Sequence, residues 1–460
     1  MQAPFPTPVT GRPVNPLLTA PILPTMIRLS LPNLAAMLAS TLVAIIETIY
    51  VGRLGTPALA GMALVFPMVM LQQMFSAGAM GGGVSSAISR ALGAGDELRA
   101  RALAFHALLI AVIASVSFMA LFLVFGPQVY ASLGGRGDAL NQALVYSNVF
   151  FTGLLGIWLT NTLASVIRGG GNMRVPSATL FTVAAGQAIL GGGLGLGLWP
   201  FPRLGMVGVA LGQVLAYGVG AVVLIWFMRS GRARVPLLLR GIPVRRDMFN
   251  DILKVGALAA FSPLQTVLTV LILTSLVARF GTESLAGYGI GARLEFLLVP
   301  ITFAIGVACL PMVGMAVGAS NAARARRVAW TGGAVSAVIT GIVGLVVVAV
   351  PDVWATWFTS DPAVLESARS YLRWSGLGYG FFGLGLCLYF ASQGAGQVLG
   401  PVLAGTSRLL VVAAGGWWLA SISAPQWMMF ALIGVAMTVY GLATAFAVYL
   451  TTWGSQARKG

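Results

Sequence analysis

Ionisable side chains are scarce in this sequence, and their scarcity excludes a soluble protein. Charged residues make up 8% of the 460 residues, and hydrophobic residues make up 58%. Soluble domains carry roughly 25% charged residues, because their whole surface faces water. A chain with so few charges must expose most of its surface to lipid, so the composition predicts a membrane protein.

Histidine, cysteine and acidic residues are also few, which argues against an enzyme. His106 is the only histidine, and Cys309 and Cys387 lie in apolar segments without disulfide or metal-ligand spacing. The eleven acidic residues are mostly scattered through predicted loops. An intramembrane enzyme needs a carboxylate pair, a histidine-bound metal or a Ser/Lys pair. We therefore expect no catalytic residues, no metal site and no cofactor.

What the sequence does have is a series of long apolar runs. Each is about twenty residues long, enough to cross a hydrocarbon layer of roughly 30 Å as a helix. Lipid offers the backbone no hydrogen bonds, so such runs must be helical. The predicted fold class is an all-α polytopic membrane protein with about twelve spans. The spans start near Met26, Leu59, Arg101, Asn141, Pro176, Met206, Asp251, Ser284, Arg327, Ser367, Pro401 and Trp427.

Lysine and arginine gather on one side of the predicted membrane, which fixes the expected orientation. That side holds both termini and the central loop 229–250. The other side has little beyond Arg53, Arg136, Arg203 and Arg279. The positive-inside rule therefore predicts cytoplasmic termini and a multi-pass protein of the inner (plasma) membrane. The net charge of +16 faces the anionic inner leaflet, so no nucleic-acid partner is needed to explain it.

The two halves of the sequence repeat each other. "VGRLGTPALAG" at 51–61 returns as "VARFGTESLAG" at 277–287, which is 226 positions later. "LGAGDELRARA" at 92–102 returns as "VGASNAARARR" at 317–327, and Tyr146 falls on Tyr371, both at an offset of 225. A nearly constant offset through several motifs indicates an internal duplication.

An even number of spans in each half predicts two lobes related by a pseudo-two-fold axis along the membrane normal. The expected division is an N-terminal tail (1–25), an N-terminal six-helix lobe (26–228), a cytoplasmic loop (229–250), a C-terminal six-helix lobe (251–453) and a C-terminal tail (454–460). Two lobes around a shared cleft suit alternating access, so we expect a transporter, acting as a monomer in the lipid bilayer.

An ordered set of motifs in both halves resembles the MATE (multidrug and toxic compound extrusion) family of bacterial type. The motifs include "ETIYVGRLGTPALAG", "IRGGGNMRVPS", "FGTESLAGYGIGARLE" and "LYFASQGAGQVLGPVLAG". The resemblance implies an antiporter that exports organic cations or similar amphiphiles against inward H⁺ or Na⁺. Two departures matter. Glu47 stands where the family usually has an aspartate, and Gly191–Gly193 occupy the place of a second aspartate, with Gln187 the nearest polar side chain.

Glu47 is the first candidate for ion coupling. A carboxylate at the centre of a spanning helix costs roughly 2.5–3.5 kcal/mol to insert, and it often marks an ion or substrate path. The alternative is a side chain that reaches the outer interface. A proton and a cationic substrate would compete for this one negative charge. A sodium site needs several oxygen ligands, so we favour H⁺ over Na⁺ as the coupling ion.

Glu295 on the eighth span is the second candidate for ion coupling. Arg293 is two residues away, so the two side chains do not share a helix face. The alternative is that both anchor the outer end of the span. Asp251 and Asp361 lie at predicted span ends, where capping or hydration is expected.

Substrate contacts are predicted from Glu47 itself, from intramembrane amides, and from apolar side chains that suit variable cations. The candidates are Gln187, Gln265, Gln393, Asn161, Phe66 and Met70. Helix–helix bonding for the amides and lipid contact for Phe66 and Met70 are the alternatives.

Two other functions are compatible with twelve spans. A flippase for a lipid-linked oligosaccharide or another lipid needs several basic residues inside the cleft, whereas nearly all basic residues here fall in cytoplasmic loops. A channel needs a polar filter motif, which is not apparent. A small-molecule antiporter is the function that we expect.

Overall fold

A computed structural model describes residues 16–238 and 241–453, and all regular structure in these ranges is helical. Most of the predicted N-terminal tail and all of the predicted C-terminal tail lie outside the described residues. The first half contains α1 (Pro16–Thr19), α2 (Ile22–Gly52), α3 (Thr56–Gln73), the π-helix η1 (Met74–Met80), α4 (Gly81–Gly93), α5 (Glu97–Ser132), α6 (Gly137–Thr152), α7 (Leu154–Gly169), α8 (Arg174–Leu196) and α9 (Met206–Arg229). The second half contains α10 (Arg246–Ala259), α11 (Phe261–Ala278), α12 (Thr282–Gly318), α13 (Ala322–Ala349), α14 (Asp352–Ala355), α15 (Pro362–Ser375), the 3₁₀ helix η2 (Gly376–Gly378), α16 (Tyr379–Ala395), α17 (Leu399–Ser421) and α18 (Gln426–Leu450).

The predicted all-α membrane fold is confirmed. In the described ranges, eleven helical segments are long and apolar enough to cross a membrane, and α6 with α7, bent by 51°, form a twelfth, broken span. The helices begin at or slightly before the predicted starts, for example at Thr56 rather than Leu59 and at Gln426 rather than Trp427.

The repeated motifs form matching turns in the two halves. Gly55 before α3 and Gly281 before α12 have φ values of 116° and 99°, a region in which only glycine is comfortable. Asp96 and Asn321 cap α5 and α13, and each side chain accepts a backbone N–H three residues later, at 2.8 and 3.0 Å. The duplication therefore preserves the residues that start helices.

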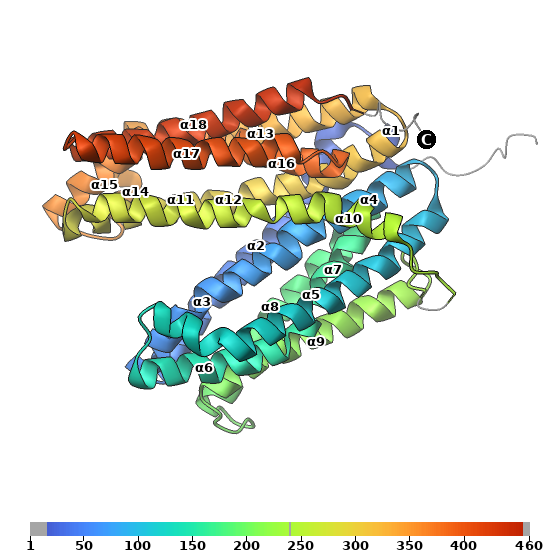
Figure 1. Ribbon diagram of the computed structural model, residues 1–460, viewed down its shortest axis with the longest axis horizontal. Helices are drawn as coiled ribbons and strands as arrows, with labels where there is room; N and C mark the ends of the chain where they lie inside the picture. The colour runs from blue at the N-terminus through green and yellow to red at the C-terminus, as the bar shows by residue number, and fades with distance from the viewer. Residues whose placement is uncertain (1–15, 239–240, 454–460) are drawn as a thin grey trace, which may run out of the picture.

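The helices form two bundles that diverge from one end of the molecule (Figure 1). At that end, α4 of the first half packs against α10, α12 and α16 of the second. This is the end predicted to be cytoplasmic. The structure thus has its two lobes in contact at the predicted cytoplasmic end.

Glycine lets the backbones of α4 and α12 meet at this contact. A Cβ atom at Gly93 would lie 2.8 Å from the carbonyl carbon of Met315, and one at Gly318 would lie 2.9 Å from the amide nitrogen of Ala94. Gly93 and Gly318 occupy equivalent positions of the repeat. The crossing of α4 and α12 therefore lies where the two copies of one motif face each other.

Charged and polar bonds also join the lobes. The carboxylate of Asp251 on α10 accepts hydrogen bonds from the guanidinium groups of Arg90, at 2.6 Å, and Arg99, at 3.0 Å. The Ser86 hydroxyl on α4 donates to the backbone carbonyl of Gln393 on α16. Asp251 thus pairs across the lobes instead of capping a helix, whereas Asp361 caps α15 as expected.

Candidate functional site

Glu47 is buried inside the N-terminal lobe, where it has only neutral hydrogen-bond partners. It is 6% exposed and lies near the end of α2. The amide of Gln187 on α8 donates to Oε2 at 3.0 Å, and the Tyr146 hydroxyl on α6 lies 3.4 Å from Oε1. In the described part of the chain, no lysine or arginine forms an ion pair with this carboxylate.

Tyr146 connects Glu47 to a fourth helix. Its hydroxyl also lies 2.8 Å from Oε1 of Gln213 on α9. A phenol has one proton to donate, so it can donate to Glu47 or to Gln213 at any moment. The shorter distance favours Gln213, which leaves the phenol oxygen facing Glu47 as an acceptor.

Tyr50 lies one helical turn beyond Glu47, against the glycines that replace the expected aspartate. A Cβ atom at Gly191 would lie 2.7 Å from the Tyr50 hydroxyl oxygen, and one at Gly192 would lie 3.3 Å from the ring. The Tyr50 hydroxyl is buried and has no hydrogen-bond partner among the described residues. At the place of the expected aspartate, Gly191 and Gly192 therefore leave room for the side chain of Tyr50.

Glu295 has an equivalent partner in the C-terminal lobe. The Tyr371 hydroxyl on α15 donates to Oε1 of Glu295 on α12. Tyr371 is the repeat equivalent of Tyr146, and its ring packs edge-on against Tyr288 at 5.5 Å between centroids. In each lobe, the duplicated tyrosine thus lies within hydrogen-bond distance of a glutamate side chain.

The sequence analysis missed Arg408, a half-buried arginine in the middle of α17. Its guanidinium lies 5.4 Å from the centroid of the Phe382 ring and 6.0 Å from that of Tyr440. The signal was visible, because Arg408 interrupts the long apolar run that begins at Pro401. The prediction assigned basic residues to the loops between spans, and Arg408 lies within a span.

The other predicted substrate residues lie apart from Glu47. Asn161 donates to Ser76 at 2.8 Å, and Gln265 donates to Thr406 at 2.8 Å, so both amides bond to neighbouring helices. Gln393 is fully buried at the contact between lobes, and neither polar atom of its side chain has a partner among the described residues.

The two predicted apolar contacts are on α3. Phe66 is 42% exposed and Met70 is 39% exposed. Neither is part of the hydrogen-bonded group formed by Glu47, Gln187, Tyr146 and Gln213.

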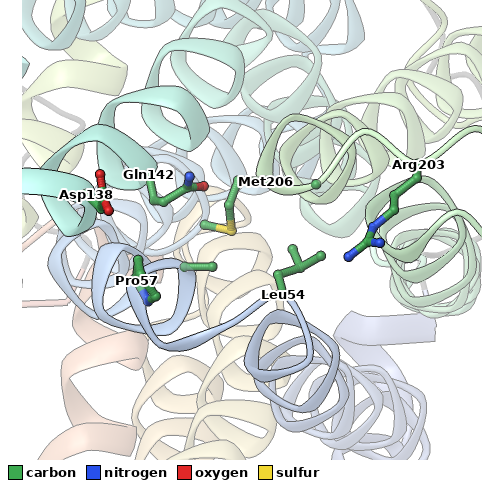
Figure 2. Close-up of a pocket in the computed structure, with 8 residues that line it drawn as sticks. Leu54, Pro57, Asp138, Gln142, Arg203 and Met206 are labelled. Atoms are coloured by element: carbon green, nitrogen blue, oxygen red, sulfur yellow. The ribbon is translucent and has the colours of Figure 1, made fainter.

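Two surface pockets lie at the end of the N-terminal lobe that is predicted to be outside. The first, of about 280 Å³, has Asp138 on one side and Arg203 on the other, with Leu54, Pro57 and Met206 between them (Figure 2). None of the predicted site residues lines it.

The second pocket, of about 470 Å³, lies between α2 and α8 and is lined by Tyr50, Arg53 and Trp199. Tyr50 thus lines this pocket three residues after Glu47 in α2.

A family model named MatE matches residues 32–191 and again residues 259–418. The chain belongs to the MatE family. Members of this family are transporters, so the chain is a membrane transporter and not an enzyme. The two matched ranges fall in the two halves that the repeat relates.

Curated relatives of this MatE chain have different names. The FAD transporter of Shewanella oneidensis is 25% identical over 376 residues, covering 82% of each chain. The probable multidrug resistance protein NorM of Thermotoga maritima is 26% identical over 381 residues, covering 82% of this chain and 81% of that one.

Solved structures share the fold. A MOP-superfamily transporter from Pyrococcus furiosus is 22% identical, with a TM-score of 0.85 over 94% of this chain and 96% of that chain. A multidrug resistance MATE transporter in an outward-facing conformation is 23% identical, with a TM-score of 0.83 over 95% and 96%. These likenesses confirm the two-lobe, twelve-helix architecture.

Proposed function

We propose that this chain is a secondary antiporter that exports cationic or amphiphilic small molecules in exchange for inward H⁺, with Glu47 as the coupling residue. The observation that carries the proposal is a buried carboxylate whose partners, Gln187 and Tyr146, are neutral. A basic partner would hold the carboxylate ionised. Neutral partners can satisfy it with or without a proton, as exchange requires.

Tyr146 supports both protonation states of Glu47. When Glu47 is ionised, the phenol donates its proton to the carboxylate. When Glu47 is protonated, the acid donates to the phenol oxygen, and the phenol donates to Gln213. The change of state thus reverses one hydrogen bond and keeps Glu47 bonded to Tyr146 in both states, while Gln213 has the phenol proton only when Glu47 is protonated.

Alternating access would expose Glu47 to the two sides in turn. In the predicted orientation, the lobe contact between α4 and α12 closes the cytoplasmic side, and the Glu47 end of α2 lies toward the outside. A proton from outside would displace a bound cation, and the lobes would then rock to the other state.

Glu295 with Tyr371 is the second coupling candidate. Na⁺ is the less favoured ion, since Glu47 is surrounded by few oxygen ligands.

The test uses proteoliposomes loaded with a fluorescent organic cation, under an imposed proton gradient and then a sodium gradient. We expect proton-driven exchange in the wild type and its loss in Glu47→Gln, while Glu47→Asp keeps the carboxylate and retains part of the activity. Undiminished exchange in Glu47→Gln would refute the role of Glu47 and make Glu295→Gln the next variant.

The flippase alternative has less support from the distribution of basic residues. A pyrophosphate-linked lipid requires several cations inside the lobes, whereas most basic residues here fall in predicted cytoplasmic loops, with Arg408 on α17 and Arg293 on α12 as exceptions. Failure to move any soluble cation under either gradient would favour the flippase.

A further inference from the structure

Arg408 lies deep within the predicted membrane layer. It is nine residues after Leu399 in α17, which places it about 13 Å along the helix from the end predicted to be cytoplasmic. Intramembrane arginines are rare, and they usually face the interior of a bundle, where they mark a substrate or ion path.

The side chain of Arg408 points into the C-terminal lobe. Its guanidinium lies over the rings of Phe382 on α16 and Tyr440 on α18. Arg408 therefore lies on the side of α17 that faces α16 and α18.

Arg408 nevertheless lacks a counter-ion. Within residues 16–238 and 241–453, no carboxylate lies within 4 Å of its guanidinium. Its Nε is buried without a hydrogen-bond partner in these ranges, and Glu295 on α12 takes its hydrogen bond from Tyr371. Ring faces partly stabilise a cation, but they accept none of the hydrogen bonds that a guanidinium can donate.

We propose that Arg408 binds the oxyanion, a carboxylate or a phosphate, of the transported molecule, so that the C-terminal lobe selects amphiphiles that carry an anionic group. This inference rests on the proposed export function and adds a substrate class to it. The rings of Phe382 and Tyr440 suit an aromatic body next to the oxyanion.

Phospholipid head groups contain the same oxyanion chemistry. They lie at the membrane interface, however, whereas Arg408 lies about 13 Å along its helix from the predicted cytoplasmic end. A lipid phosphate would have to leave the interface to reach Arg408. A transported molecule inside the lobe meets no such barrier.

The test is equilibrium binding to the full-length protein in phosphatidylcholine nanodiscs, followed by fluorescence anisotropy without any ion gradient. The probes are rhodamine B, which has a free carboxylate, and its ethyl ester, which has the same cationic ring system without it. The variants are Arg408→Gln and Arg408→Lys. Arg279→Gln, an exposed arginine at the end of α11, is the control.

We expect Arg408→Gln to weaken binding of the carboxylate dye relative to the ester by roughly tenfold to hundredfold, the loss of a charge-assisted bond. Ester binding should stay intact, which also reports a folded protein. Arg408→Lys keeps the charge and should keep part of the preference, and Arg279→Gln should keep all of it.

Three results would overturn the inference. The first is an unchanged preference in Arg408→Gln, and the second is an equal loss for both dyes. The third is competition by added phosphatidylglycerol in the wild type but not in Arg408→Gln, which would assign the site to a lipid head group. Because no gradient is used, failure of Glu47 to couple transport leaves this measurement unaffected.

Discussion

Replacing Asp251 by asparagine should shift the protein from the state with lobes in contact at the predicted cytoplasmic end toward the opposite state. The Asp251 carboxylate accepts hydrogen bonds from two arginines of the other lobe, from Arg90 at 2.6 Å and from Arg99 at 3.0 Å. The three side chains are 18–36% exposed, so the network lies between an exposed ion pair and a buried one. We place its contribution at about 1–2 kcal/mol, a factor of roughly 5–30 in the equilibrium between the two states.

The shift can be measured as a distance between spin labels at the far ends of the lobes. Ser132 and Ser360 are exposed and belong to different lobes, so Ser→Cys at both positions provides one label in each. The native Cys309 and Cys387 are buried and should remain unlabelled. Pulsed electron paramagnetic resonance in nanodiscs should show a larger short-distance population in Asp251→Asn than in the labelled parent.

Asp352→Asn provides the matched control. Asp352 forms a two-pronged bond with Arg369 at 2.7 and 3.1 Å, but both residues belong to the C-terminal lobe. Its loss should leave the distance distribution unchanged. Identical distributions for Asp251→Asn and its parent would refute the reasoning that this ion-pair network holds the lobes together.

Further substitutions test other contacts. Gly318→Val places a side chain where even a Cβ lies 2.9 Å from the Ala94 nitrogen, so the cytoplasmic contact should open and the same labels should show a larger short-distance population; an unaltered distribution would contradict the close crossing. Tyr146→Phe removes the hydroxyl next to Glu47, and proton-driven efflux should fall roughly tenfold in proteoliposomes. Full activity would show that Gln187 alone suffices. Asn161→Ala loses its bonds between helices and should destabilise the protein by about 1–3 kcal/mol, seen as a lower melting temperature; an unchanged value would refute this.

Periodic and repeated features of the fold could be predicted from the sequence. Apolar runs predict spans because the hydrocarbon layer has a fixed thickness. The offset between Gly55 and Gly281 predicts equivalent turns because both copies need a glycine at positive φ. Glu47 and Gln187 could be named because each is polar within an apolar run.

Partnerships between distant helices could not be predicted in this way. Tyr146 and Gln213 meet Glu47 only through the packing of α6 and α9 beside α2, and neither residue type is unusual in a span. For Glu295, the sequence suggested only the neighbouring Arg293 as a partner. The contact with Tyr371, 76 residues away, was not predicted, although Tyr371 is the repeat equivalent of Tyr146.

The duplicated tyrosine has a consequence for how the two lobes could diverge. Tyr146 and Tyr371 are equivalent, yet their acids come from non-equivalent spans: Glu47 from the first span of its lobe and Glu295 from the second. The repeat therefore places the phenol at the same position in both lobes, but not the acid. Substitution of one acid therefore leaves the acid of the other lobe in place, so the two sites can be altered independently of each other.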